Sequence, residues 1–379
     1  MHYDAIIVGA RCAGSATAMQ LARGGKKVLV LDRAAPGADT MSTHALMRGA
    51  VIQLARWGLL ERVIASGAPV VNRTRFTYGG EVIDVPIRPT KETPGLIAPR
   101  RHILDSILAD AARAAGAQIQ YGTSFIEVLR NGQDAVSGVV FERNKRLQQA
   151  FAPLVIGADG RRSTLARRVN AGIRKQARHA TSCVYAYFEG LPNEGYRWFY
   201  DQGLAAGAIP THGGLHCIFA STTTARFREL VRVEGSEGAL RQLVADTDAA
   251  FGCAMAGLSA VTRPLIFGGE HGFLRDASGP GWALVGDAGY FKDPNTAHGI
   301  TDAFRDADIL SRSILSGQPL STFEATRNAL SVDLFNLTNR IASFDWTLGE
   351  LKAMHLRLNE IMAAEQSFIA GKGQTLLAA

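Results

Sequence analysis

The first 32 residues contain an apolar strand, a glycine-containing turn, a helix and a second apolar strand in direct succession. The spacing of apolar residues predicts strands at 3–8 and 27–31 and a helix at 13–23, which Gly24 and Gly25 end. A strand–turn–helix–strand unit of about 30 residues is typical of α/β proteins with helices packed on a sheet. It therefore constrains the fold of the N-terminal part of the chain.

The turn between the first strand and the helix has features that suit a nucleotide. Gly9 permits a tight turn, and Gly14 lets the helix pack closely on the strand. The helix N-terminus offers unpaired N–H groups to a pyrophosphate, and Asp32 can hold a ribose hydroxyl. Arg11 stands where such turns usually have their second glycine. The alternative to a nucleotide site is therefore a turn of the same kind that binds no nucleotide.

Two later strands also run into glycine and aspartate. The strand at 154–156 leads into Gly157-Ala158-Asp159-Gly160, and the strand at 282–285 leads into Gly286-Asp287-Ala288-Gly289. The second segment continues through Pro294 to a helix that begins near Gly299. Such strand ends place a carboxylate at the edge of the sheet, where glycine permits an abrupt turn.

The N-terminal unit resembles the FAD fingerprint of glutathione-reductase-like flavoproteins. Together, the three motifs resemble those of the para-hydroxybenzoate hydroxylase-like, or group A, flavoprotein monooxygenases and of the related geranylgeranyl reductases. The resemblance implies an α/β fold: a glutathione-reductase-type Rossmann FAD-binding domain formed by 1–69, 98–174 and 266–319. A β-sheet substrate domain, 70–97 and 175–265, is inserted into it, and 320–379 form a C-terminal helical region.

The resemblance also implies roles for individual residues. Asp287 binds the ribitol hydroxyls, Asp159 lies near the pyrophosphate and the nicotinamide groove, and Arg101 contacts FAD. A helix N-terminus near Gly299 stabilises negative charge on the reduced flavin; Thr301 stands where the family usually has asparagine. The candidate cofactor-binding residues are Gly9, Arg11, Ala13, Gly14, Asp32, Arg33, Arg101, Asp159, Gly160, Gly286, Asp287, Gly299, Ile300 and Thr301.

No side-chain acid or base is evident, so the reactive chemistry is expected to come from the cofactor. His44, Pro294 and Gly299 are the candidate residues beside the flavin. His44 either faces the flavin or caps the following helix, and His212 either lines the cavity or belongs to a hairpin that Gly213 and Gly214 turn. The candidate substrate residues are Arg48, Tyr187, Tyr200, His212 and Phe291.

After residue 160 no second glycine-rich loop follows a strand, so NAD(P)H is expected to bind transiently. The primary hypothesis is an FAD-dependent monooxygenase that uses NAD(P)H and O2. It would oxygenate a small organic, aromatic or polyketide-like molecule through a flavin C4a-hydroperoxide. The alternative is a reductase or dehydrogenase of the geranylgeranyl reductase type that acts on a carbon–carbon bond. A halogenase is disfavoured because a Trp-x-Trp-x-Ile-Pro motif is missing.

Composition sets further expectations. The net charge of +7 comes from dispersed basic doublets, which disfavours nucleic-acid binding. The scattered cysteines predict no metal site, and the short apolar runs predict a cytoplasmic protein without integral membrane segments. Two C-terminal apolar stripes predict helices without a catalytic role, and a homodimer is left open. The stripes are Leu330, Leu334, Leu337, Ile341 and Phe344, and then Leu348, Leu351, Met354, Leu358 and Ile361.

Overall fold

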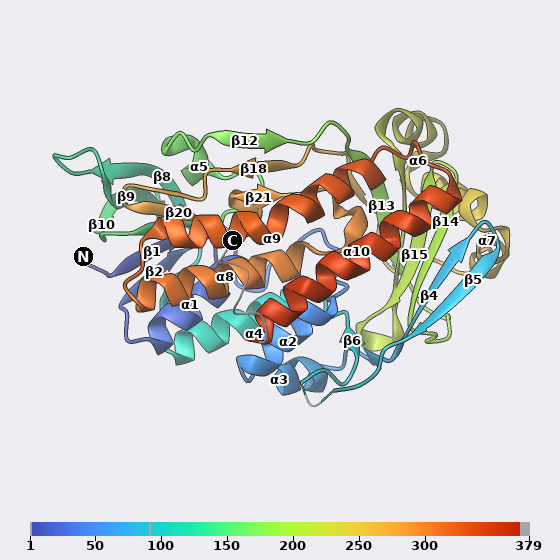
Figure 1. The fold of residues 1–379 in the computed structure, drawn as a ribbon, viewed down its shortest axis with the longest axis horizontal. Helices are drawn as coiled ribbons and strands as arrows, with labels where there is room; N and C mark the ends of the chain where they lie inside the picture. Colours follow the sequence, from blue (N-terminus) through green and yellow to red (C-terminus); the bar gives the residue numbers. More distant parts are fainter. Residues whose placement is uncertain (1, 91, 372–379) are drawn as a thin grey trace.

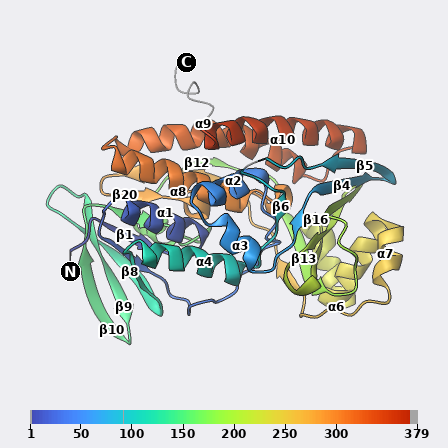
Figure 2. The same cartoon turned by 90° about the horizontal axis from the view of Figure 1, so that it is seen from below.

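The computed structural model describes residues 2–90 and 92–371, and its two largest sheets lie at opposite ends of the molecule (Figures 1 and 2). The first sheet has the strand order β19-β20-β11-β1-β2-β7. Its strands run parallel except for β19 at the edge. The bounds are Ala5–Val8 (β1), Val28–Leu31 (β2), Gln118–Gln120 (β7), Val155–Gly157 (β11), Ser278–Gly279 (β19) and Trp282–Leu284 (β20).

Successive side chains of β1 and β2 point to opposite faces of this sheet and enter separate cores. Ile7 and Val30 pack among the helices, where α1 contacts both α4 and α8. Ile6 and Leu29 pack against a three-stranded sheet in the order β10-β9-β8. The bounds are Cys12–Arg23 (α1), Arg101–Ala114 (α4), Gly299–Leu315 (α8), Thr123–Arg130 (β8), Val136–Arg143 (β9) and Arg146–Phe151 (β10).

The second large sheet, here called the roof sheet, has the strand order β17-β13-β16-β15-β14-β4-β5. Val184 and Ile218 point toward α6 and α7, while Tyr185 and Phe219 point to the opposite side, toward Ala45 and the C-terminal helices. The strands are Arg73–Tyr78 (β4), Glu81–Pro86 (β5), Thr181–Phe188 (β13), Tyr196–Asp201 (β14), Leu204–Pro210 (β15), His216–Thr223 (β16) and Leu265–Phe267 (β17). The helices are Thr224–Thr247 (α6) and Ala249–Met255 (α7).

Of the two long C-terminal helices, Leu320–Ile341 (α9) runs from the first sheet toward the roof sheet, and Leu348–Ile369 (α10) turns back alongside it (Figure 2). The remaining helices are Arg48–Arg56 (α2), Leu60–Ala65 (α3), Thr164–Arg168 (α5), His212–Gly214 (η1), Gly286–Ala288 (η2) and Pro294–Thr296 (η3). The remaining strands are Val70–Val71 (β3), Leu96–Ile97 (β6), Ile173–Gln176 (β12), Phe273–Arg275 (β18) and Tyr290–Phe291 (β21). Over the described residues, no helix is both long enough and apolar enough to cross a membrane.

Candidate active site

The turn between β1 and α1 brings backbone into contact with backbone. Gly9 has φ +105°, and a Cβ atom there would lie 2.4 Å from the carbonyl oxygen of Ala158. A Cβ atom on Gly14 would lie 1.8 Å from the carbonyl oxygen of Gly9. Neither backbone atom can move aside as a flexible side chain would. Both glycines are therefore required for α1 to begin this close to the ends of β1 and β11.

Arg11 is compatible with this turn. Its φ of −88° is ordinary for any L residue, so the position does not require glycine. The Nη1 atom donates a hydrogen bond to Thr40 Oγ1 at 2.6 Å. No side chain caps the N-terminus of α1, so the first N–H groups of the helix are available to an anion.

Asp32 at the end of β2 is fixed by two backbone groups. Its carboxylate oxygens accept hydrogen bonds from the N–H groups of Ala10 and Ala34, each at 2.7 Å. A small cavity beside this carboxylate is lined by Arg11, Asp105, Tyr121 and neighbouring backbone. Arg33, which follows, is exposed. The arrangement leaves the second lone pair of each Asp32 oxygen for a ribose hydroxyl.

Arg101 at the start of α4 reaches toward the same region. It donates from Nη2 to both carboxylate oxygens of Asp105, at 3.1 and 3.2 Å. Asp105 also accepts from the Cys12 thiol at 3.1 Å, which ties α4 to the first turn of α1. The positive charge of Arg101 also acts on Asp287.

Asp287 lies in η2, directly after the positive-φ residue Gly286. Within 2–90 and 92–371, the carboxylate of Asp287 takes part in no hydrogen bond or ion pair. Burial raises its pKa to about 6, although Lys292 and Arg101 favour the ionised form. The side chain is half-buried. A carboxylate in such a position without protein donors is a site at which the hydroxyl groups of a ligand would supply hydrogen bonds.

Asp159, after β11, has local partners. Its oxygens accept hydrogen bonds from the hydroxyl of Ser163 and from the N–H groups of Thr164, at 2.6 Å, and Leu165. The carboxylate therefore supports the N-terminus of α5, and Gly160, with φ +78°, makes the turn.

The N-terminus of α8 follows η3 and is formed by Gly299, Ile300 and Thr301. Pro294 opens η3, and the side chain of Asp293 accepts from the N–H of Asn295 at 3.1 Å. Thr301 is buried, and its methyl group would meet a Cβ atom on Gly49 of α2 at 2.8 Å. Thr301 thus packs α8 against α2.

A buried arginine ties α8 to α10. Arg305 is fully buried, and its Nη1 atom donates to Asp302 at 3.1 Å and to Glu365 at 2.7 Å. His298, the residue before α8, contacts the other oxygen of Glu365. Burial alone would raise the pKa of Glu365, but His298 and Arg305 hold this pKa below its usual range. Glu365 is therefore ionised at neutral pH.

The same arginine is connected to the glycine–aspartate turn. Arg305 Nη2 donates to Asp306 at 2.7 Å and to Ser331 of α9 at 2.9 Å. The other oxygen of Asp306 accepts from the N–H of Gly286 at 3.2 Å. One connected set of hydrogen bonds thus joins η2, α8, α9 and α10.

His298, Asp302 and Glu365 bring three buried ligand-type atoms within 4.8 Å of one another. Arg305 and Lys292 already neutralise these carboxylates, since Lys292 pairs with Asp302. A metal ion would have to displace two buried cations. We therefore interpret the cluster as an ion-pair network, here called the Arg305 network.

His44 is buried and has φ +50°. Its Nε2 atom lies 2.7 Å from the hydroxyl of Tyr187 on the roof sheet, and its Nδ1 atom has no hydrogen-bond partner among the described residues. Burial lowers its pKa to about 3, so the imidazole is neutral. The helix-capping alternative is wrong, because α2 begins at Arg48 with Met47 as its N-cap and no side-chain cap.

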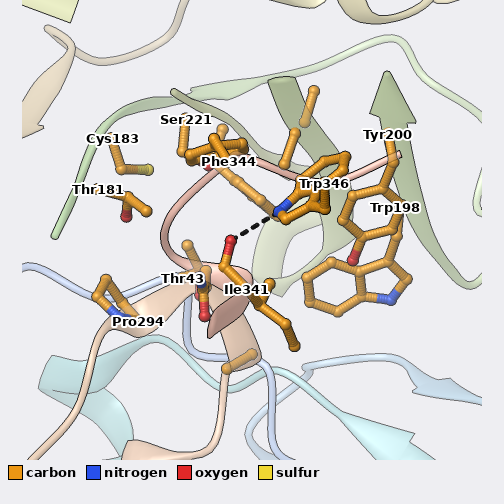
Figure 3. A pocket seen from close by; sticks show the side chains of 15 residues that line it. Thr43, Thr181, Cys183, Trp198, Tyr200, Ser221, Pro294, Ile341, Phe344 and Trp346 are labelled. Atoms are coloured by element: carbon orange, nitrogen blue, oxygen red, sulfur yellow. Dashed lines mark hydrogen bonds between the residues drawn. The ribbon is translucent and has the colours of Figure 1, made fainter. Parts of the chain in front are cut away.

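A small cavity lies between the roof sheet, η3 and the loop that joins α9 to α10 (Figure 3). Figure 3 shows the rings of Trp198, Tyr200 and Trp346 gathered on one side, with Thr43 and Pro294 on the other. Trp346 Nε1 donates to the carbonyl oxygen of Ile341 at 2.9 Å, which fixes the loop. The lining residues are Thr43, Thr181, Cys183, Trp198, Tyr200, Ala205, Ala206, Phe219, Ser221, Pro294, Asn295, Ala297, Ile341, Phe344 and Trp346.

The loop between α9 and α10 differs from the sequence prediction. Phe344 was expected to continue the apolar face of a helix, but α9 ends at Ile341. Phe344 instead has φ +54° and lines the cavity beside Trp346. The C-terminal region therefore contributes to the candidate site, and neither Phe344 nor Trp346 was predicted from the sequence to line it. Asn295, another lining residue, was also missed.

The predicted substrate residues lie in different places. Tyr200 lines the cavity, whereas Tyr187 pairs with His44. Arg48 donates to the carbonyl oxygen of Arg88 on the surface. His212 in η1 bonds to Ser66 and to the N–H of Arg100. Phe291 packs against Phe267 and Phe273.

The glycine turn, the unpaired carboxylate and the enclosed cavity together define a nucleotide-dependent oxidoreductase of the flavoprotein class. The chain belongs to the FAD binding domain family, whose model matches residues 2–194. It is similar to the menaquinone reductase of Mycolicibacterium smegmatis, with 26% identity over 83% of this chain and 76% of that protein. It is also similar to the squalene monooxygenase of Candida glabrata, with 35% identity over 29% of this chain and 23% of that protein.

Solved structures give the same fold. The structure of the flavin-dependent brominase Bmp2 matches with a TM-score of 0.81 and 17% identity, over 97% of this chain and 94% of that chain. At this identity the likeness concerns the fold alone.

The protein is thus a flavin-dependent oxidoreductase whose cofactor is FAD. The residues present fit this cofactor on structural grounds. The first turn of α1 can receive a pyrophosphate, and Asp32 can receive a ribose hydroxyl. Asp287 offers a half-buried carboxylate without a partner among the described residues, and no Cβ atom at Gly9 or Gly14 could be accommodated.

Proposed function

We propose that this protein is an FAD-dependent monooxygenase whose organic substrate binds in the cavity beneath the roof sheet. Bound FAD would pass two electrons from NAD(P)H to O2, so that one oxygen atom enters the substrate and the other leaves as water. The division into an FAD-binding part, a roof-sheet substrate part and a C-terminal helical part belongs to the same proposal.

The observation that carries this proposal is the lining of the cavity. The described residues that line it include no Asp, Glu, Lys, Arg or His, and aromatic rings form much of the wall. Such a lining excludes water, which a monooxygenase requires if reduced oxygen is to reach the substrate without being lost to solvent. Thr43, Pro294 and Ala297 extend the same cavity to the loop before α2 and to the segment before α8.

Residues around the cofactor are assigned supporting roles under this proposal. The N–H groups at the start of α8 stabilise negative charge that develops at the reduced isoalloxazine. Asp287 and Asp32 would bind the ribitol and the ribose, Arg101 would contact the FAD, and Asp159 would lie near the pyrophosphate. The Arg305 network holds α8 and the turn at Gly286 in place. NAD(P)H, the typical reductant of the family, would bind transiently.

A reductase that acts on a carbon–carbon double bond is the second candidate. Its supporting observation is the menaquinone reductase relative, which matches most of this chain. Reduction of such a bond requires a proton as well as a hydride. The proton donors in the lining are weak acids, because burial raises the pKa of Cys183 to about 12 and also raises that of Tyr200. This chemistry favours the monooxygenase.

The test is to reduce the purified FAD-loaded protein without oxygen, mix it rapidly with oxygenated buffer and follow the flavin spectrum. The monooxygenase proposal predicts a transient absorbing species between the reduced and oxidised spectra. It also predicts incorporation of one ¹⁸O atom from ¹⁸O₂ into a substrate found by screening. Slow reoxidation in a single step under all conditions would refute the proposal and favour the reductase.

A further inference from the structure

We propose that Asn295 anchors the substrate, and that this substrate is an uncharged, flat aromatic molecule carrying a carbonyl or amide group. The inference deepens the proposed function and rests on it for the claim that the cavity is where the substrate binds. Asn295 belongs to η3, the short segment that precedes α8, and lines the cavity beneath the roof sheet.

The side chain of Asn295 lines the cavity without a partner. Its Oδ1 and Nδ2 atoms are both buried, and neither has a hydrogen bond within 2–90 and 92–371. A buried amide left without partners costs about 1–3 kcal/mol for each unsatisfied group. A ligand that offers both an acceptor and a donor would remove that cost. Asn295 is therefore suited to a carbonyl or amide group of the ligand.

The backbone of Asn295 is fixed before any ligand binds. Asp293 accepts from the N–H of Asn295 at 3.1 Å and from the N–H and hydroxyl of Thr181 on the roof sheet, at 2.7 and 2.8 Å. These bonds occupy the carboxylate of Asp293, which is not among the lining residues. The backbone of Asn295 is thus held in a defined place, so that binding has to order only the side chain.

The rest of the lining determines the class of substrate. Aromatic side chains form walls of the cavity: Trp198, Phe219, Phe344 and Trp346. The rings of Trp198 and Phe219 meet edge to face, with their centroids 5.6 Å apart. Flat rings bind to such walls by stacking and by edge-to-face contacts. The lining contains no charged side chain among the described residues, so a carboxylate or ammonium group would be desolvated without a counter-ion. This excludes the anionic substrates that the net charge of the chain would otherwise suggest.

Three probes with the same ring test the assignment: 2-naphthamide, 2-ethylnaphthalene and 2-naphthoate. Binding to the oxidised FAD-loaded protein is measured by quenching of tryptophan fluorescence and by the shift of the flavin absorbance, with no turnover. We expect 2-naphthamide to bind at least tenfold more tightly than 2-naphthoate. Failure of 2-naphthamide to bind up to its solubility limit, or equal binding of 2-naphthoate, would overturn the assigned substrate class.

Variants test the role of Asn295. Asn295→Leu should weaken 2-naphthamide binding about five- to tenfold, the range of one or two hydrogen bonds in a closed site, and leave 2-ethylnaphthalene binding unchanged. Asn328→Leu is the matched control, because Asn328 on α9 also has a buried Oδ1 atom without a partner but does not line the cavity. It should leave the affinity of every probe unchanged.

The flavin content of each variant separates two roles for the amide. If Asn295→Leu purifies with less FAD than Asn328→Leu, the amide serves the cofactor and the proposal is wrong. Equal loss of affinity for 2-naphthamide and 2-ethylnaphthalene would also refute it. Probe binding is measured without oxygen transfer. These experiments therefore test the role of Asn295 even if the rapid-mixing test refutes the monooxygenase proposal.

Discussion

Replacing Glu365 by glutamine should destabilise the protein by about 3–5 kcal/mol, the cost typical of breaking a buried ion pair. Glutamine has the same shape as glutamate but lacks its charge. Glu365 is 3% exposed and accepts a hydrogen bond from the fully buried Arg305 at 2.7 Å, while its other oxygen contacts His298. The substitution therefore leaves positive charge in the interior with one carboxylate fewer.

The magnitude follows from the bonds that are lost. A hydrogen bond between charged partners contributes about 1.5–3 kcal/mol, and a neutral amide keeps about 0.5–1.5 kcal/mol of it. Two such bonds give a loss of roughly 2–3 kcal/mol, and the loss of one of the three carboxylates that pair with the buried Arg305 raises the total toward the upper figure. The folded pKa of Glu365 lies below its unfolded value of about 4.3. Its contribution is therefore complete at neutral pH and is lost as the pH falls below about 4.

The assay is urea unfolding of the FAD-loaded protein at pH 7, followed by flavin and tryptophan fluorescence. Glu360→Gln is the matched control, because Glu360 lies on the same helix and pairs with Arg357 at 2.8 Å with both side chains exposed. Exposed pairs contribute little, so the control should change the free energy of unfolding by less than about 0.5 kcal/mol. Glu365→Gln should also release FAD at lower urea. If the two variants unfold within 1 kcal/mol of each other, the Arg305 network does not hold α8 in place.

Three further predictions concern residues of the candidate site. Gly14→Ala should weaken FAD binding and lower the free energy of unfolding by about 1–3 kcal/mol, because the new Cβ atom would meet a backbone oxygen at 1.8 Å. Flavin titration and thermal unfolding measure the two effects. Gly132→Ala, at a position with open space around it, is the control and should show neither effect. Burial raises the pKa of Asp287 to about 6, so the free energy of unfolding of the FAD-free protein should fall by about 2–3 kcal/mol as the pH rises from about 4 through 6. Asp287→Asn should bind FAD more weakly and should not show this pH dependence. A similar fall in Asp287→Asn would contradict the assignment. Tyr187→Phe leaves Nε2 of His44 unpaired and should lower the free energy of unfolding by about 1–3 kcal/mol. Thermal unfolding tests this, and an unchanged midpoint temperature would rule out the pair as a stabilising contact.

The sequence was informative where a site is built from one short segment. The turn from Gly9 to Gly14 carries its constraint locally, since the close approach of α1 to β1 requires glycine at fixed spacing. Whether the turn accepts Arg11 in place of the middle glycine became clear only from the structure. The answer depends on the φ value of Arg11 and on Thr40 as its hydrogen-bond partner. Neither can be read from composition or periodicity.

The cavity could not be predicted from local patterns, because its walls come from distant segments. Trp198 belongs to the roof sheet, Asn295 precedes α8, and Trp346 lies between α9 and α10. The periodicity of the C-terminal residues predicted helices correctly, but it could not show that Phe344 leaves the helix with a positive φ. Likewise, no local signal reveals that Glu365 meets Arg305, since the two residues are 60 positions apart.

That separation affects how the protein is made on the ribosome. At a synthesis rate of about 5–20 residues per second, Glu365 is added roughly 3–12 s after Arg305. During this interval the nascent chain already contains Asp302 and Asp306, yet it lacks Glu365, the third carboxylate that pairs with Arg305 of α8. The full set of buried partners of Arg305 is therefore complete only after α10 has been synthesised and has docked.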